Sequence, residues 1–138
     1  MEAVYWGAKH DRSRGAGAGP WVMADLEDGL WAGDTAFNSH NVPVEAEYVT
    51  AMLKGRPGGF CLKGGDAASG SLTKMWEGPR PAGYNPMKKQ GAIILGIGGD
   101  NSDSAAGTFY EGAITAGYSS DKADAAVQAS IVAAGYGR

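Results

Sequence analysis

The fold is organised around the stretch GPWVMADLEDGLWAG, residues 19–33. Residues 21–27 are rich in strand formers, and the dipeptide Asp28-Gly29 is typical of a two-residue hairpin turn. Because side chains alternate along a strand, Asp25 and Glu27 are expected to point to the same face. Taken alone, two acids on one strand face favour a solvent-exposed surface over a catalytic site.

The composition is typical of a single all-β domain. The chain has 138 residues, enough for one domain that buries roughly two thirds of its unfolded surface. Glycine supplies 23 of them, which favours many tight turns between short strands over long helices. We therefore predict one all-β domain over residues 1–138.

Charge and hydropathy exclude several kinds of partner. The net charge is −3, and no basic block is dense enough to neutralise a row of phosphates, so nucleic acid is not an expected partner. No apolar run approaches the roughly 20 residues of a membrane span, and the first residues do not resemble a secretory signal. The one cysteine, Cys61, excludes an intrachain disulfide or thiolate metal site, and we expect it to pack as a small apolar residue.

Hydrophobic patterning predicts the remaining elements. A C-terminal helix is expected over residues 121–134, capped by Ser119-Ser120, ended by Gly135 and buried along a stripe formed by Val127 and Ile131. The glycine-rich segments 9–19 and 64–70 are expected to be loops, the first of them mobile. Further strands are predicted at 3–6, 45–53, 60–63, 72–76, 91–99 and 108–115.

Two polar positions outside the hairpin were weighed for chemistry. His10 is interpreted as a solvated loop histidine, since His40 is the only other histidine and no carboxylate lies at helical or hairpin spacing to it. Asp100 follows Gly99 at the end of the most apolar run, where a sheet enzyme can place a catalytic acid. An Asp-Asn pair is equally typical of a turn, and both readings stay open at this point.

Two blocks, GPWVMADLE (19–27) and GAIILGIGGDNS (91–102), resemble the catalytic domain of the α-L-arabinofuranosidase B family, glycoside hydrolase family 54. Four more blocks resemble the same family in the same order: AASGSL (67–72), GYNPM (83–87), GTFYEG (107–112) and the segment 127–134. The resemblance covers essentially the whole chain.

The resemblance implies a concanavalin A-like β-sandwich and an extracellular enzyme that removes terminal α-L-arabinofuranosyl groups from arabinan and arabinoxylan with retention. Glu27 matches the family's nucleophile and Asp100 its general acid/base, while Asp25 and Gly99 match sugar contacts. Asp28 stands where the family has an asparagine that touches the substrate. A retaining glycosidase needs two carboxyls about 5–5.5 Å apart and no metal or other cofactor.

The chain also departs from the family pattern. It resembles only the C-terminal part of the catalytic domain, so the N-terminal strands, an adjacent-cysteine pair and the arabinose-binding module have no counterpart. Arg12 falls where the family has a substrate-stacking tryptophan. Two alternatives to an enzyme stay open: a non-catalytic, lectin-like carbohydrate-binding sandwich, with calcium near residues 100–103, and an incomplete gene product without an independent role.

Overall fold

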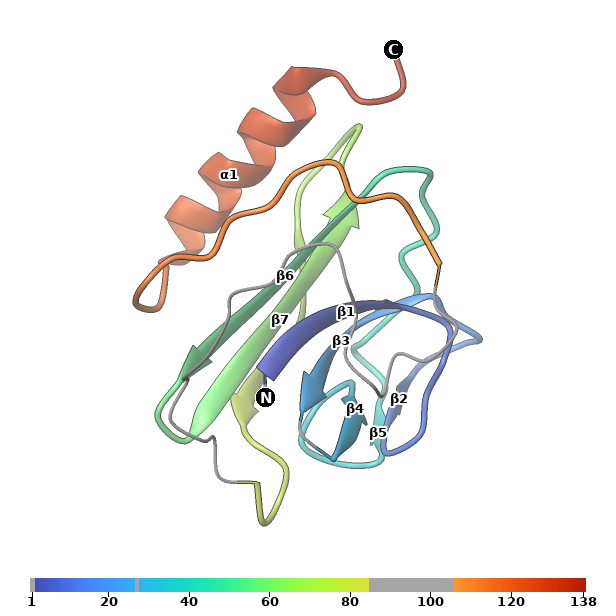
Figure 1. Cartoon of the computed structure of the whole chain (residues 1–138), viewed down its shortest axis with the longest axis vertical. Coiled ribbons are helices and arrows are strands. Elements are labelled where there is room, and N and C mark those ends of the chain that lie inside the picture. Colours follow the sequence, from blue (N-terminus) through green and yellow to red (C-terminus); the bar gives the residue numbers. More distant parts are fainter. Residues whose placement is uncertain (1, 27, 85–105) are drawn as a thin grey trace.

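The computed structural model describes residues 2–26, 28–84 and 106–138, which form three sheets and one helix (Figure 1). The first sheet has the order β1-β3-β4, with bounds Glu2–Gly7, Trp21–Leu26 and Gly29–Trp31. The second pairs β2 (Arg14–Gly15) with β5 (Phe37–Asn38) in parallel. The third has the order β6-β7-β8, with bounds Val49–Arg56, Gly59–Asp66 and Thr73–Pro79.

The predicted hairpin at the centre of the sequence is confirmed, with one correction. Strands β3 and β4 pair antiparallel, with Asp25 opposite Leu30 and Leu26 opposite Gly29. Gly29 is thus the first residue of β4, whereas the Asp28-Gly29 dipeptide predicted that it would lie in the turn. Its φ of 141° is a conformation that side chains larger than hydrogen rarely adopt.

Strands β6, β7 and β8 form an antiparallel meander in which β6 is shifted along the chain and β7 and β8 are longer than predicted. β6 begins at Val49, later than the predicted residue 45, and runs to Arg56, while β7 continues through the glycines that we expected to be a loop. The β7–β8 pairing shifts register between Leu62 and Lys63. Glycines fit this part of β7 because the close packing of neighbouring side chains leaves little room there: a Cβ on Gly64 would lie 2.7 Å from a methyl of Val22.

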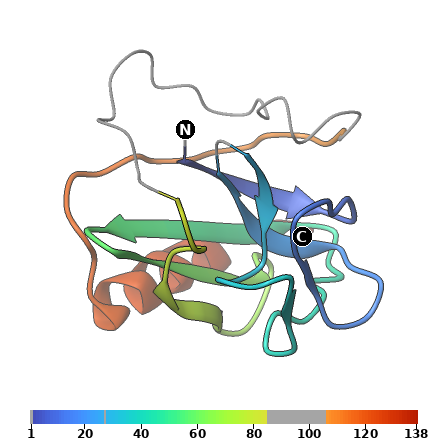
Figure 2. The same ribbon diagram turned by 90° about the horizontal axis from the view of Figure 1, so that it is seen from below.

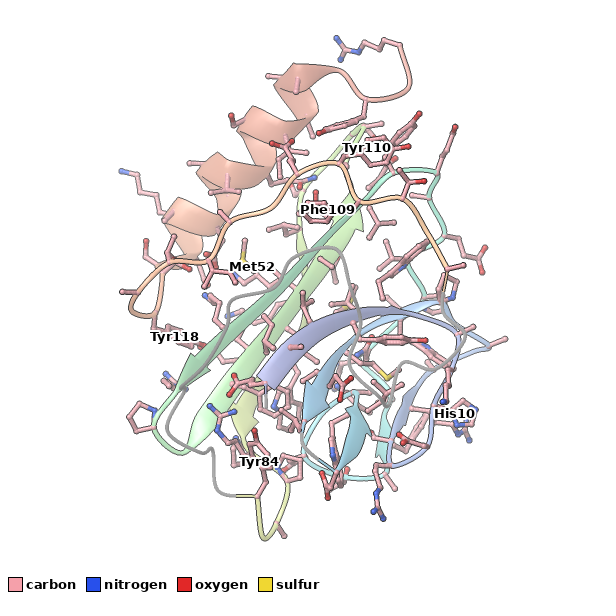
Figure 3. The ribbon with its side chains drawn as sticks, in the orientation of Figure 1. His10, Met52, Tyr84, Phe109, Tyr110 and Tyr118 are labelled. Atoms are coloured by element: carbon pink, nitrogen blue, oxygen red, sulfur yellow. The ribbon has the colours of Figure 1, made fainter. Side chains whose placement is uncertain are left out.

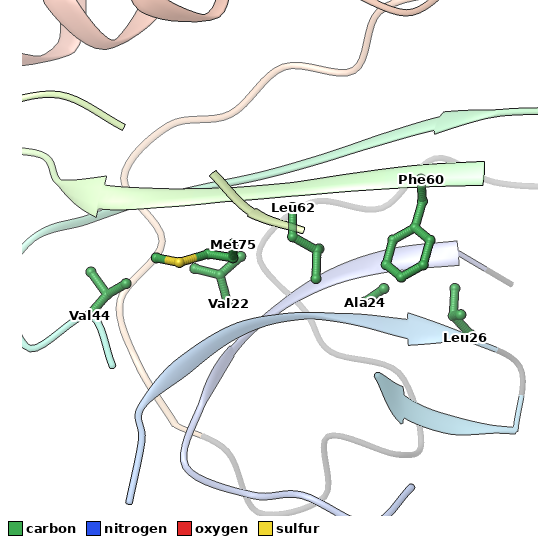
Figure 4. Close-up of a cluster of buried hydrophobic side chains, with 7 residues drawn as sticks. All are labelled: Val22, Ala24, Leu26, Val44, Phe60, Leu62 and Met75. Carbon is green, nitrogen blue, oxygen red and sulfur yellow. The ribbon is translucent and has the colours of Figure 1, made fainter. Parts of the chain in front are cut away.

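The β1-β3-β4 and β6-β7-β8 sheets pack face to face around the main core, as predicted for an all-β sandwich (Figure 4). Each large apolar side chain buried in this way contributes about 1.5–3 kcal/mol to stability. The core consists of Val22, Ala24, Leu26, Val44, Phe60, Leu62 and Met75.

The helix α1, Asp121–Ala134, lies on the other side of the β6-β7-β8 sheet from β1 and β3 (Figure 2). Its predicted ends are confirmed, since the Ser120 side chain accepts a hydrogen bond from the amide of Ala123 and Gly135 adopts a left-handed φ of 82°. No helix in the described part of the chain combines the length and apolarity needed to cross a membrane.

The predicted buried stripe of α1 is wrong. Val127 is 49% exposed and Ile131 is only partly buried, whereas Asp124 and Gln128 are 1% and 2% exposed. The helix therefore faces the sheet with polar side chains. The reason lies in the sheet, because β6 and β7 present Lys54 and Lys63 on their outer face, and buried ammonium groups need an anionic partner.

Asp124 is the centre of this polar contact. Its Oδ2 accepts hydrogen bonds from Lys54 Nζ at 2.7 Å and Lys63 Nζ at 2.6 Å, and its Oδ1 accepts one from the Ser119 hydroxyl at 2.5 Å. Burial raises the pKa of Asp124, but these hydrogen bonds outweigh it and hold the pKa below its usual value. Burial likewise lowers the pKa of Lys63, and its hydrogen bonds to Asp121 and Asp124 raise it overall. Asp124 and Lys63 thus stay charged near neutral pH.

The strand predicted over residues 108–115 is also wrong, since that segment is exposed and has no ladder. Tyr110 instead contacts Tyr48 and Tyr136, with ring centroids 5.4 and 5.6 Å away, beside the C-terminal end of α1 (Figure 3). Strand-forming residues make a strand only where a partner strand is available. The predicted strand at 91–99 lies outside the described residues.

Replacing Asp124 with asparagine should lower the free energy of unfolding by about 3 kcal/mol, because it leaves the buried lysines without their shared carboxylate. Urea unfolding followed by circular dichroism measures the change. The matched control is Asp121→Asn, which removes a carboxylate that contacts the same lysines but is 64% exposed. It should cost less stability than Asp124→Asn, and equal losses in the two variants would contradict the central role of Asp124.

Candidate active site

Asp25 is a buried carboxylate, which overturns the solvent-exposed interpretation of this strand face. All six residues of β3 are buried, and Asp25 is 1% exposed. Alternation puts it on the face of Trp21 and Met23, which belong to a second apolar cluster with Tyr5, Leu30 and Ala32. Burying an ionisable group costs free energy, so such groups concentrate where chemistry requires them.

Asp28 lies at the exposed end of the same hairpin and is held by two contacts. Its Oδ1 accepts a hydrogen bond from the indole Nε1 of Trp31 at 3.1 Å, which orients the carboxylate. Its main-chain carbonyl accepts a second from the guanidinium Nε of Arg12 at 2.8 Å. The structure thus brings Asp25 and Asp28 together on one hairpin, one buried and one accessible.

The loop that follows β1 is fastened to this hairpin by Asp11. One oxygen of Asp11 accepts hydrogen bonds from the amides of Arg12 at 2.7 Å and Leu30 at 2.8 Å. The amide of Ser13 then donates to the carbonyl of Leu30 at 3.1 Å. The loop lies so close to Gly29 that a Cβ there would be 2.4 Å from Arg12 Cγ. Loop and hairpin therefore form one packed unit.

Three of the predicted site residues, Glu27, Gly99 and Asp100, lie outside the described residues, as does the segment 100–103 of the calcium alternative. Their roles stay predictions. In the described part of the chain, no group of three or more His, Cys, Asp or Glu side chains is arranged to hold a metal ion.

Two residues of this unit, Asp11 and Trp31, were missed by the sequence analysis. The sequence did contain a signal for the contact between Trp31 and Asp28. Residues on either side of a tight turn lie close together, so an indole can reach an acid three positions earlier. No sequence signal pointed to Asp11, since its hydrogen-bond partner Leu30 is distant in sequence. His10 is exposed, with its ring 5.7 Å from that of Trp21.

The prediction that Cys61 packs as a small apolar residue is confirmed. Its side chain is fully buried, and burial raises the pKa of the thiol. A protonated, inaccessible thiol is not a nucleophile.

Comparison with known proteins identifies relatives of the whole chain. Residues 1–137 match the family described as "Alpha-L-arabinofuranosidase B, catalytic". The chain is 56% identical over 140 residues to alpha-L-arabinofuranosidase B of Emericella nidulans and 54% identical over 139 residues to an alpha-L-arabinofuranosidase of Hypocrea jecorina. Each match covers 99% of this chain and 28% of the relative, so the chain spans just over a quarter of the length of these curated proteins.

Solved structures agree with the sequence relatives. An arabinofuranosidase complexed with arabinofuranosyl-α-1,2-xylobiose superposes with a TM-score of 0.89 at 49% identity, over 98% of this chain and 29% of that one. A GH54 α-L-arabinofuranosidase soaked with a cyclic sulfate inhibitor gives a TM-score of 0.88 at 50% identity, with the same coverage. These relatives bear out the predicted family resemblance and the sandwich, and they favour an enzyme over a lectin-like protein.

Replacing Asp11 with alanine should detach the loop from the hairpin, because the buried amide of Leu30 loses its acceptor. An unsatisfied buried amide costs about 1–3 kcal/mol, and hydrogen exchange at the Leu30 amide, followed by NMR, should accelerate accordingly. Glu45→Ala, at an exposed residue for which no interaction is found in the described structure, is the control and should leave that exchange rate unchanged. Unaltered protection in Asp11→Ala would contradict the fastening role of Asp11.

Proposed function

The chain belongs to the family of α-L-arabinofuranosidase B catalytic domains, and we propose that it carries the reacting carboxyls of a retaining glycoside hydrolase. Its substrates would be terminal α-L-arabinofuranosyl groups on arabinan and arabinoxylan, in the degradation of hemicellulose outside the cell. The observation that carries the proposal is the burial of Asp25, at 1% exposure, in the strand whose sequence continues into Glu27.

In the proposed first step, a carboxylate oxygen of Glu27 attacks the anomeric carbon of the arabinofuranosyl group. The bond from that carbon to the leaving oxygen breaks, and Asp100 gives its proton to the leaving oxygen. In the second step, Asp100 takes a proton from water, and the resulting hydroxide displaces Glu27 from the sugar. Two carboxyls about 5–5.5 Å apart are needed for this sequence, and the distance between Glu27 and Asp100 is a prediction of the proposal.

Three residues would hold the sugar, of which Asp25 and Asp28 are described and Gly99 is not. Asp25 and Gly99 would contact sugar hydroxyls, and the burial of Asp25 restricts its side chain to few orientations. Asp28 would make the contact that an asparagine makes in the family. Trp31 Nε1 donates to one of its oxygens, and among the described residues no hydrogen bond to the other oxygen is found, so that oxygen would accept from a hydroxyl group. A carboxylate there adds a negative charge beside the nucleophile.

The unmodified chain should release 4-nitrophenol from 4-nitrophenyl α-L-arabinofuranoside, and Glu27→Gln should slow this by more than about a thousandfold, because the amide is a poor nucleophile. Absorbance of the released phenolate measures the rate. Glu45→Gln, an equivalent change at an exposed acid, should leave the rate unaltered. Should the unmodified chain release nothing, the proposal that these 138 residues act as an enzyme by themselves would fail.

Asp100→Asn should slow hydrolysis by about a hundredfold to ten-thousandfold for substrates with poor leaving groups, since general acid catalysis contributes this much. Aryl arabinofuranosides whose phenols leave easily should be affected less in their first step. The measurement is a series of aryl substrates of increasing phenol pKa. An equal loss of rate across the series would contradict the acid role of Asp100.

A further inference from the structure

Arg12 is held at the edge of the candidate active site by the contacts that fasten its loop. Its amide donates to Asp11, and its neighbour Ser13 donates to the carbonyl of Leu30. Its side chain runs over Gly29, where only a hydrogen atom leaves room for Arg12 Cγ. Its Nε donates to the carbonyl of Asp28 at 2.8 Å, so the guanidinium is fixed one residue beyond Glu27 in the sequence.

Within the described part of the chain, no hydrogen bond from the two terminal nitrogens of this guanidinium is found. Arg12 is exposed, and within the described residues its side chain makes one hydrogen bond and no ion pair, even though Asp11 and Asp28 are its neighbours. The Asp28 carboxylate bonds to Trp31 and that of Asp11 to main-chain amides. A guanidinium has five N–H groups, and the four on its terminal nitrogens form a planar fork that fits a carboxylate.

The segment that carries Arg12 is basic, and Asp11 and Asp28 are the acidic residues next to Arg12. The segment 9–14, KHDRSR, carries three basic side chains and one acidic side chain in a protein whose net charge is −3. The guanidinium of Arg14, the other arginine of this segment, lies over the ring of Phe37, 5.1 Å from its centroid. Both arginines are exposed, and Arg12 is the one that contacts the β3–β4 hairpin.

We propose that Arg12 selects the substrate by binding a carboxylate on the sugar chain that bears the arabinofuranosyl group. The preferred substrates would then be arabinofuranosyl oligosaccharides that also carry a uronic acid close to the scissile linkage. This inference rests on the proposed function, because it needs the sugar to be bound beside Glu27. Arg12 positions the substrate and takes no part in bond breaking.

The test measures binding to the Glu27→Gln variant, in which the ligand survives. The ligands are an arabinofuranosyl xylo-oligosaccharide with a glucuronic acid on the neighbouring xylose, and the methyl ester of the same compound. Charge-assisted hydrogen bonds should make the acid bind about tenfold more tightly than the ester by calorimetry. In the double variant Glu27→Gln, Arg12→Gln, the affinities for the acid and the ester should be nearly equal. Adding Arg12→Lys, which keeps the charge and loses the fork, should give an intermediate ratio.

Arg14→Gln is the matched control and should keep the preference for the acid. Equal affinity for acid and ester in the Glu27→Gln variant would overturn the inference, as would a preference that survives Arg12→Gln. Hydrolysis of 4-nitrophenyl α-L-arabinofuranoside separates this failure from that of the proposed function. Release together with equal affinities refutes only the role of Arg12, whereas no release and no binding of either ligand refutes both proposals.

Discussion

The structure depends on β3 being buried on both of its faces. One face packs Val22, Ala24 and Leu26 against Phe60 and Leu62 of the opposite sheet, and the other packs Trp21 and Met23 in the second cluster. A strand enclosed in this way cannot slip by one residue, because slippage would exchange the two sets of side chains. The strand therefore fixes the position of Asp25 within the second face, and with it the geometry of the hairpin end.

The loop of residues 9–13 completes the hairpin from outside the sheet. Asp11 accepts the hydrogen bond that the amide of Leu30 donates, and Gly29 leaves the space that the loop occupies. The two segments are distant in sequence and pack as one unit, so a change in either alters the surroundings of Asp28. This arrangement is why a residue of a glycine-rich connection, Arg12, contributes to the edge of the candidate active site.

The helix α1 is attached to the sandwich by charges, whereas its amphipathic pattern predicted an apolar contact. Two lysines from the outer face of the sheet share Asp124, and Asp121 approaches Lys63 at 2.7 Å and Lys74 at 3.2 Å. Those contacts lower the pKa of Asp121 to about 2, through hydrogen bonds from Lys63 first and Lys74 second. The helix thus contributes a charged layer on the side of the β6-β7-β8 sheet away from the main core, and Val127 stays exposed.

The sequence by itself determined the features that depend on near neighbours: the β3–β4 hairpin, the caps of α1 at Ser120 and Gly135, and the family, whose motifs are short and in order. Its pattern also put Asp25 and Glu27 on one strand face and Asp100 at the end of an apolar run, and the resemblance named these three, with Asp28 and Gly99, as site residues. Only the tertiary structure decided that Asp25 is buried, that α1 faces the sheet with Asp124, and that residues 108–115 form no strand. Each of these depends on which distant side chains arrive at a surface, and local patterns of hydrophobicity carry no information about that.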